Sequence, residues 1–354
     1  MKGLILSGGK GTRLRPITHT SAKQLIPVAN KPVLYYGIEA IRAAGIREVG
    51  IVVGDTASEV KQAVGTGRRF GVKVTYIHQE EPLGLAHAVK VSQDFLKDSP
   101  FVMYLGDNLI AQGITDLVKQ FKKSSPDAMI LLARVDHPEW FGVAELDGER
   151  IARLVEKPQK PKSDLALVGV YMFTESVMEA VNSIKPSGRG ELEITDAIQW
   201  LVDRGRRVEP HLVEGWWKDT GRVEDMLEAN RIVLDTFSED VHGTVDKKSQ
   251  VEFKVRVEKG ARIKNSVVRG PAIIGKKTVI ENSYVGPFTS IDDNCLVMES
   301  EIENSIMLSG SSLKNMPKRV ADSLIGRDVI IDCTRGRPEA LKFVLGESSR
   351  VNLV

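Results

Sequence analysis

The sequence has few cysteines and no long apolar run, and each absence excludes a class of protein. Cys295 and Cys333 stand far apart, without the CxxC spacing or the nearby histidines of a zinc site. Such a pair makes neither a disulfide framework nor a structural metal site, so we expect both to be small buried or semi-buried residues. No segment reaches membrane-spanning length and no signal-peptide pattern is present, which predicts a cytoplasmic protein without a membrane partner.

A charge excess of one sign is also missing. The chain has 49 Lys and Arg against 47 Asp and Glu, a formal net charge of +2, so no long-range field draws it to nucleic acid. Apolar residues make up 42% and charged residues 27%, as in folded globular proteins. At 354 residues the chain exceeds what one core usually organises, so two domains are expected.

Short apolar runs and amphipathic stretches alternate over the first part of the chain. Examples of the runs are GLILS (3–7), EVGIVV (48–53) and PFVMYLGD (100–107). This βαβ rhythm predicts an α/β, Rossmann-like fold with a mostly parallel, mixed sheet and ligands at the carboxyl ends of its strands. Shorter strands between residues 127 and 235 predict antiparallel additions to that sheet, within a first domain over residues 1–240.

Aliphatic residues recur at six-residue intervals in the last third of the chain. They are Val267, Ile273, Val279, Val285, Ile291 and Val297, with Ile325 and Ile331 repeating the spacing further on. A period of six is typical of a parallel β-helix, in which three hexads make one coil and each aliphatic residue points inward. We expect a linker over SEDVHGTVDKKSQ (238–250) and a hexapeptide-repeat β-helix domain within residues 241–354.

The stretch GGKGTR (8–13) follows the first apolar run directly. It is not a P-loop, which needs GxxxxGK[ST], nor a dinucleotide fingerprint, whose third glycine is replaced here by Leu14. Glycines let backbone N–H groups approach phosphate oxygens, and Arg13 could add a bidentate cationic contact. The stretch therefore predicts an anion-binding loop of another kind.

Together with this loop, five later segments resemble the sugar nucleotidylyltransferases in order and spacing. They are AKQLIPV (22–28), QEEPLGLAHA (79–88), LGDN (105–108), EKP (156–158) and WWKDTG (216–221). Within that group the chain is similar to the glucose-1-phosphate thymidylyltransferases, and its six-residue repeat resembles the left-handed β-helix of the longer members. The resemblance implies a Rossmann-like nucleotidyltransferase domain followed by a left-handed parallel β-helix.

The resemblance also implies a reaction, the transfer of a nucleotidyl group from dTTP or UTP to glucose 1-phosphate with release of pyrophosphate. In-line transfer of this kind needs fixed cations and metal-binding carboxylates, not a covalent nucleophile. Asp107 and Asp219 match the family's metal-binding aspartates, which implies Mg²⁺ as cofactor. The catalytic matches are Asp107, Arg13 and Lys23 at the triphosphate and Lys157 at the sugar phosphate.

The remaining matches imply the binding surfaces for the base and the sugar. The nucleotide-binding positions are Leu6, Gly8, Gly9, Gly11, Thr12, Arg13, Gln79, Pro82, Gly84, Leu85 and Asp107. The sugar-phosphate positions are Asn108, Gly142, Glu156, Lys157, Leu167, Gly169, Tyr171 and Trp217. Gln79 would read the pyrimidine edge, and Glu156 would accept hydrogen bonds from sugar hydroxyls. His78 and His87 are not needed as general bases, because the attacking phosphate oxygen already carries charge.

Several alternatives stay open or are weakened. A mannose-1-phosphate guanylyltransferase shares the glycine loop, EKP and the β-helix, although QEEPLGLAHA favours a pyrimidine. A uridylyltransferase fused to an acyltransferase would need a catalytic histidine, and none occurs from residue 245 onward. A regulatory homologue would not need to keep both Asp107 and Asp219. Because the end of a solenoid offers unpaired backbone and apolar surface, we also expect a homo-oligomer.

Overall fold

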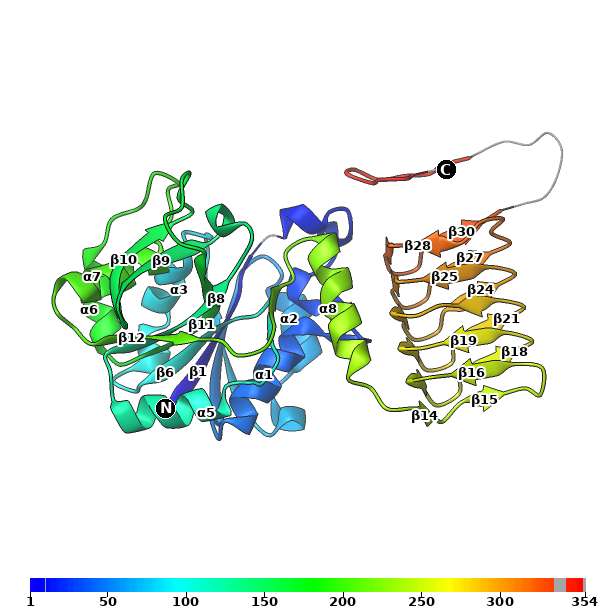
Figure 1. Ribbon diagram of the computed structural model, residues 1–354, viewed down its shortest axis with the longest axis horizontal. Helices are drawn as coiled ribbons and strands as arrows, with labels where there is room; N and C mark the ends of the chain where they lie inside the picture. Colours follow the sequence, from blue (N-terminus) through cyan, green and yellow to red (C-terminus); the bar gives the residue numbers. More distant parts are fainter. Residues whose placement is uncertain (10, 334–341, 353–354) are drawn as a thin grey trace. The chain divides into compact units, whose positions relative to one another are not determined.

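The chain forms two compact units in the computed structural model, which describes residues 1–9, 11–333 and 342–352 (Figure 1). The first unit comprises Met1–Lys10, Ser21–Leu25 and Val33–Asp219. The second comprises Gly11–Thr20, Ile26–Pro32 and Thr220–Val354. Two short segments near the amino terminus therefore belong to the same unit as the carboxy-terminal repeat.

A mixed sheet is the centre of the first unit. Its nine strands, counted within the described residues, are β1 (Lys2–Ser7), β4 (Glu48–Val53), β5 (Lys73–His78), β6 (Phe101–Leu105), β8 (Ala128–Arg134), β9 (Gly142–Asp147), β10 (Arg150–Glu156), β11 (Leu165–Phe173) and β12 (Val208–Leu212). Strands β6, β1, β4 and β5 lie side by side and parallel. Strand β11 is antiparallel to β6, β8 and β9, which confirms the predicted antiparallel additions.

Helices cover both faces of this sheet. One face carries α1 (Val33–Ala43), α2 (Ala57–Val64) and α5 (Thr115–Ser124), and the other carries α3 (Leu85–Val91), α4 (Gln93–Leu96), α6 (Ser176–Ser183) and α7 (Ile194–Asp203). Neighbouring residues of a strand serve opposite faces, since Leu4 and Leu6 belong to one core and Ile5 to the other. This three-layer arrangement confirms the Rossmann-like prediction and puts the segments after β1, β4, β5 and β6 at one edge of the sheet.

Three sheets of stacked parallel strands make up most of the second unit. The first contains β14 (Asp240–Val241), β17 (Val255–Val257), β20 (Ala272–Ile274), β23 (Thr289–Ile291), β26 (Ile306–Met307) and β29 (Leu324–Ile325). The second contains β15 (Thr244–Val245), β18 (Arg262–Lys264), β21 (Val279–Glu281), β24 (Leu296–Met298), β27 (Ser312–Lys314) and β30 (Ile330–Asp332). The third contains β16 (Gln250–Glu252), β19 (Val267–Arg269), β22 (Tyr284–Val285), β25 (Glu301–Glu303) and β28 (Val320–Ala321). The three sheets form a parallel β-helix, as predicted, and are consistent with the left-handed kind.

The strict six-residue spacing, however, is wrong for the interior of this β-helix. The side chains that fill it in successive strands are Val268, Ile274, Ile280, Val285, Ile291 and Val297. Val267, Ile273 and Val279 each precede one of these residues by one position. The step from Ile280 to Val285 is five residues (285 − 280 = 5), and stacked equivalents are 17 residues apart in the first coils, as from Val285 to Ile302. Later coils differ in length, with 16 residues from Ile291 to Met307 and 18 from Met307 to Ile325. The first coils are therefore a residue shorter than three hexads, so a strict six-residue pattern loses the interior register there. Ile325 and Ile331, predicted from the same spacing, do pack in the interior.

The polar stretch 238–250 is the first coil of the β-helix and not a linker. It contains β14 and β15 and begins β16, which pair in parallel with β17, β18 and β19 of the next coil. These strands are hydrogen-bonded through their backbones to the next coil, and they have a neighbouring coil on one side only. Apolar side chains are therefore few, which explains why the composition suggested a linker.

Buried and half-buried polar side chains connect the coils to one another and to helix α8 (Val223–Asp235). Ser249 Oγ accepts from the backbone N–H of Ser266 at 3.1 Å, and the same contact recurs one coil further on. Asn230 of α8 is fully buried, and its Oδ1 accepts from Ser290 Oγ at 2.6 Å and from the Ala29 N–H at 2.9 Å. Because every one of these groups has a partner, their burial is compatible with a stable unit.

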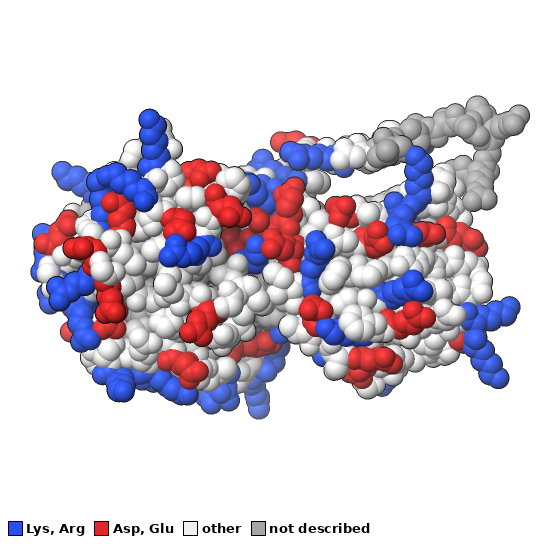
Figure 2. All heavy atoms as spheres, viewed as in Figure 1, with Lys and Arg blue, Asp and Glu red and all other residues white. Residues whose placement is uncertain are grey.

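The cysteines and the surface agree with the composition. Cys295 is buried, which raises the pKa of its thiol to about 11, and Cys333 is half-buried; both are free thiols. Basic and acidic side chains are interspersed on the face shown in Figure 2. Among the helices of the described residues, none is both long and apolar enough to cross a membrane.

Adjacent valines test the corrected register. Val268→Ala removes buried methyl groups from the β-helix interior and should lower the free energy of unfolding by about 2 kcal/mol. Val267→Ala, at the position that a strict hexad would place inside, is the matched control and should cost less than about 0.5 kcal/mol, since that side chain is half-exposed. Thermal and urea unfolding measure both variants, and equal losses would contradict the assignment of Val268, and not Val267, to the interior.

Candidate functional site

The glycine loop meets two predicted site residues where β1 ends. A Cβ atom on Gly8 would lie 3.3 Å from Gln79 Oε1, and one on Gly9 would lie 3.3 Å from Lys23 Cε. These separations are tight for a side-chain carbon, so glycine lets the backbone pass close to both side chains. Leu6 is buried, and its carbonyl accepts from the Gly106 N–H at 2.9 Å, which joins the end of β1 to the segment after β6.

The rest of the predicted loop lies in the second unit. Gly11, Thr12 and Arg13 belong to it, with Thr12 and Arg13 in a short 3-10 helix, η1 (Thr12–Leu14). Thr18 Oγ1 donates to the Gly11 carbonyl at 2.7 Å, and the side chains of Thr12 and Arg13 are exposed. The first unit by itself therefore does not contain the whole predicted phosphate loop.

A buried ion pair occupies the end of β6. Asp107 is 8% exposed and pairs through Oδ2 with the ammonium of Lys23, which stands in the 3-10 helix η3 (Lys23–Leu25). Asn108 Nδ2 donates to Asp107 Oδ1 at 3.0 Å. Burial by itself would raise the pKa of Asp107, but the Lys23 charge and the hydrogen bonds from Lys23 and Asn108 outweigh it and lower that pKa. Asp107 is therefore an anion at neutral pH.

A two-stranded ribbon brings the second predicted aspartate to the same place. Strand β13 (Trp217–Asp219) pairs antiparallel with β7 (Asn108–Ile110), so that Asp219 stands opposite Asn108, the residue after Asp107. Trp217 Nε1 donates to Asn108 Oδ1 at 2.5 Å, and the Trp217 ring packs edge-on against Phe141. Two carboxylates remote in sequence thus belong to one ribbon, Asp219 at the end of β13 and Asp107 in the turn directly before β7.

This pair of carboxylates fits a hard cation that is only partly held by protein. Mg²⁺ prefers oxygen ligands, dehydrates reluctantly, and commonly binds one or two carboxylates plus water and substrate phosphate. In residues 1–9, 11–333 and 342–352, no three His, Cys, Asp or Glu side chains form a metal-binding group. Asp107 and Asp219 could therefore contribute to a magnesium site that a bound phosphate completes.

The predicted base-reading residue is held inside a short loop. Gln79 follows β5 and is 7% exposed; its Nε2 donates to the Gly84 carbonyl at 3.3 Å and lies 3.0 Å from His87 Nδ1. Gly84 has a φ of 104°, and a Cβ there would come within 2.4 Å of the Leu192 carbonyl oxygen, so only glycine fits. Leu85, at the start of α3, is half-buried, whereas Pro82 is exposed.

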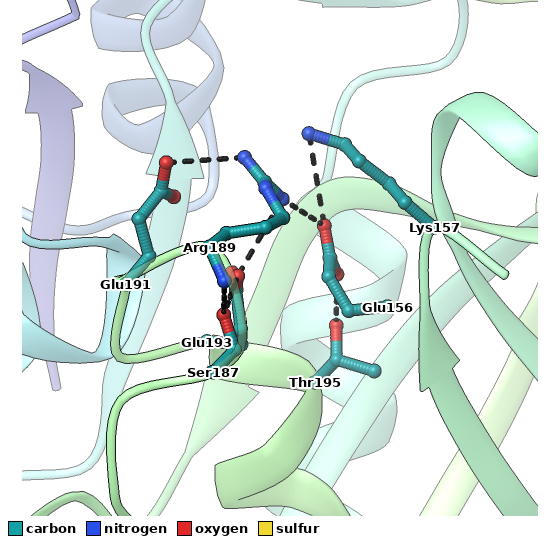
Figure 3. Close-up of polar contacts among 7 residues, drawn as sticks. All are labelled: Glu156, Lys157, Ser187, Arg189, Glu191, Glu193 and Thr195. Atoms are coloured by element: carbon teal, nitrogen blue, oxygen red, sulfur yellow. Dashed lines mark hydrogen bonds and ion pairs between the residues drawn. The ribbon is translucent and has the colours of Figure 1, made fainter.

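Glu156, the last residue of β10, is the centre of a polar network (Figure 3). Its Oε2 accepts from Thr195 Oγ1 at 2.6 Å, and its Oε1 lies 3.3 Å from Arg189 Nη1 and 3.8 Å from Lys157 Nζ. Lys157 has a φ of 40°, unusual for a residue with a side chain, and its N–H donates to the Phe141 carbonyl at 3.0 Å. The backbone therefore holds Lys157 in a costly conformation beside Glu156.

Two predicted glycines allow side chains to meet near this network. A Cβ on Gly142 would lie 2.8 Å from Thr195 Oγ1 and 3.1 Å from Glu156 Oε2. On Gly169 it would lie 2.6 Å from Leu105 Cδ1 and 2.9 Å from Asn108 Cγ. Side chains at these positions would displace Glu156 or Asn108, the residues that the glycines leave room for.

Leu167 and Tyr171 belong to the hydrophobic core beneath these groups, with exposed fractions of 5% and 3%. Burial, with a smaller contribution from the charge of Glu156, raises the pKa of Tyr171 above its usual range. Tyr171 is therefore a neutral phenol at every physiological pH. Both residues contribute to the hydrophobic core and not to the hydrogen bonds of the network around Glu156.

Sequence reasoning missed the segment that faces Glu156 from between α6 and α7. Arg189 pairs with Glu191 at 3.1 Å and with Glu193 at 3.5 Å, in addition to Glu156. Burial, followed by the charge of Glu156, raises the pKa of Glu193. The charged run GRGELE (188–193) was a usable signal, because a dense mixed-charge loop beside a helix start is unusual for a plain connection.

Comparisons with known proteins agree with this geometry. Residues 2–236 match the family model described as nucleotidyl transferase. A glucose-1-phosphate thymidylyltransferase of Streptomyces griseus is 56% identical over 354 residues, covering 100% of this chain and 99% of the relative.

Two solved structures share the fold of about two thirds of the chain. A crystal structure of a Bacillus anthracis protein assigned as a glucose-1-phosphate thymidylyltransferase is 37% identical, with a TM-score of 0.62 over 66% of this chain and 94% of the other. A UDP-glucose pyrophosphorylase in complex with UDP-glucose is 26% identical, with a TM-score of 0.60 over 66% and 98%. The resemblance inferred from the motifs is confirmed, and the chain belongs to the nucleotidyl transferase family.

Proposed function

We propose that this protein transfers a thymidylyl group from dTTP to glucose 1-phosphate, forming dTDP-glucose and pyrophosphate. The observation that carries the proposal is the buried Lys23–Asp107 pair beside Gly9, with Asp219 on the strand paired to the residue after Asp107. A fixed cation, a glycine-lined approach and two carboxylates are the groups that in-line transfer between phosphates requires. The full-length similarity to a thymidylyltransferase supports the choice of reaction.

In this proposal the sugar phosphate oxygen attacks the α-phosphorus while pyrophosphate leaves from the opposite side. Asp107 and Asp219 would hold Mg²⁺, which when bound neutralises charge on the phosphates. Lys23 and Arg13 bind the triphosphate oxygens, and Arg13 stabilises the departing pyrophosphate. Lys157 binds the phosphate of the sugar, with its ammonium 3.8 Å from Glu156 Oε1. No residue needs to act as a covalent nucleophile.

Base and sugar are bound on opposite sides of the phosphates. Gln79 reads the edge of the pyrimidine, and Leu6, Gly8, Gly84, Leu85 and Pro82 surround the base. Glu156 accepts hydrogen bonds from sugar hydroxyls, while Asn108, Gly142, Gly169, Leu167, Tyr171 and Trp217 shape the sugar site. The relative solved with UDP-glucose makes UTP the second candidate donor.

We assign nucleotidyl transfer to residues 1–240 and a supporting role to the β-helix within residues 241–354. Both ends of a solenoid present strand edges that a second copy can cover, so we propose a homo-oligomer in the cytoplasm. Val241 in the first coil and Ile330 in the last are 41% and 74% exposed, which agrees with surfaces of this kind.

A substrate panel tests the proposed reaction. Pyrophosphate release should be fastest with dTTP and glucose 1-phosphate, because the full-length relative is a thymidylyltransferase, with UTP second because it carries the other candidate pyrimidine. Mannose 1-phosphate and GTP serve as the contrasting pair. Preference for that pair would replace the proposal with guanylyl transfer, and no pyrophosphate from any combination would indicate a non-catalytic homologue.

The two carboxylates make a second prediction, about metal dependence. Asp107→Asn and Asp219→Asn should each lower kcat about 100-fold or more and raise the Mg²⁺ concentration for half-maximal rate, because each removes an anionic ligand. Asp116→Asn is the matched control, since that side chain is 93% exposed on α5. Wild-type activity that persists in EDTA would contradict the assigned metal site.

Replacing Arg13 tests the part of the loop that the second unit carries. Arg13→Ala should reduce kcat about 100-fold or more, as the loss of a positioned cation does in phosphoryl transfer. Arg150→Ala, which removes an exposed guanidinium at the start of β10, should leave the rate unchanged. Full activity in Arg13→Ala would show that the loop contacts no phosphate.

A further inference from the structure

We propose that His87 is a positioning residue that fixes the amide orientation of Gln79 and thereby favours thymine or uracil over cytosine. The inference rests on the proposed function, because it presumes that Gln79 faces a pyrimidine base. His87 stands on α3, eight residues after Gln79, and Gly84 lies between them in the chain. Sequence reasoning set His87 aside as a general base, and the structure points to a different use.

The Gly84 carbonyl determines which end of the Gln79 amide faces the loop. A carbonyl oxygen can only accept, so the group 3.3 Å from it must be the amide NH₂ and not the amide oxygen. The same NH₂ lies 3.0 Å from His87 Nδ1. In this contact Nδ1 is therefore the accepting nitrogen, with the ring proton on Nε2.

These two contacts use both hydrogens of the amide. Gln79 is 7% exposed, so its amide is largely shielded from the solvent. The oxygen end remains, and it lies on the side of Gly8, 3.3 Å from where a Cβ of that residue would be. Gln79 therefore directs only its amide oxygen, a hydrogen-bond acceptor, toward the glycine loop.

An acceptor discriminates between pyrimidines of the same size. Thymine and uracil carry an N3–H donor, whereas cytosine carries an acceptor at N3. With its NH₂ held by His87 and Gly84, the amide can accept from N3–H of thymine but cannot donate to N3 of cytosine. Without His87 one amide hydrogen is released, and rotation of the amide toward cytosine becomes easier.

The test is the ratio of kcat/KM for dTTP to kcat/KM for dCTP, with glucose 1-phosphate as acceptor. His87→Leu removes the acceptor at similar volume and should lower this ratio about tenfold, the effect of one hydrogen bond. His87→Asn can place its Oδ1 where Nδ1 stands and should restore most of the ratio. A merely structural role would lower both values together and leave the ratio unchanged.

His78→Leu is the matched control, since His78 is exposed at the end of β5 and should leave the ratio as in the wild type. If His87→Leu does not fold, as judged by its thermal unfolding, His87→Ala tests the same loss. An unchanged ratio in the leucine or alanine variant, or an asparagine variant no better than leucine, overturns the role of His87. Failure of the wild type to use dTTP or UTP at all would instead overturn the proposed function.

Discussion

The pairing of β13 with β7 is the contact on which the candidate site depends. It places Asp219 opposite Asn108, and Asn108 in turn donates to Asp107 and accepts from Trp217. One asparagine side chain thereby links the strand end that carries the first carboxylate to the strand that carries the second. Without this ribbon Asp219 would follow a polar loop with no fixed relation to the parallel sheet.

The charge of Lys23 decides the protonation state of Asp107. Burial of Asp107 would favour its protonated form, but the paired Lys23 ammonium reverses that tendency and keeps the carboxylate charged. A buried pair of this kind contributes little net stability, because desolvation offsets much of its attraction. The Lys23–Asp107 pair is better explained by the proposed reaction, in which its fixed cation and anion would interact with the substrate phosphates and their metal ion.

Close backbone approach is a second theme of the site. Gly8, Gly84, Gly142 and Gly169 each lie where a side-chain carbon would press on Gln79, on the Leu192 backbone, on Glu156 or on Asn108. These glycines surround the residues that we assign to the base and the sugar. At each of these positions, the absence of a side chain on glycine leaves space for a neighbouring side chain or backbone segment.

The sequence by itself determined the α/β order of the first part, the repeat of the second and the family, because periodicity and motif spacing are local properties of the chain; the site residues that the motifs name stay a prediction. It misjudged the coil length, since a six-residue count cannot detect one short turn among three, and it took the polar first coil for a linker. Only the tertiary structure decided which side chains meet. The Arg189 contacts with Glu156, the hold of His87 on Gln79 and the grouping of residues 26–32 with the β-helix unit all join segments remote in sequence. Such contacts arise from packing and strand pairing across the fold, which no local pattern encodes.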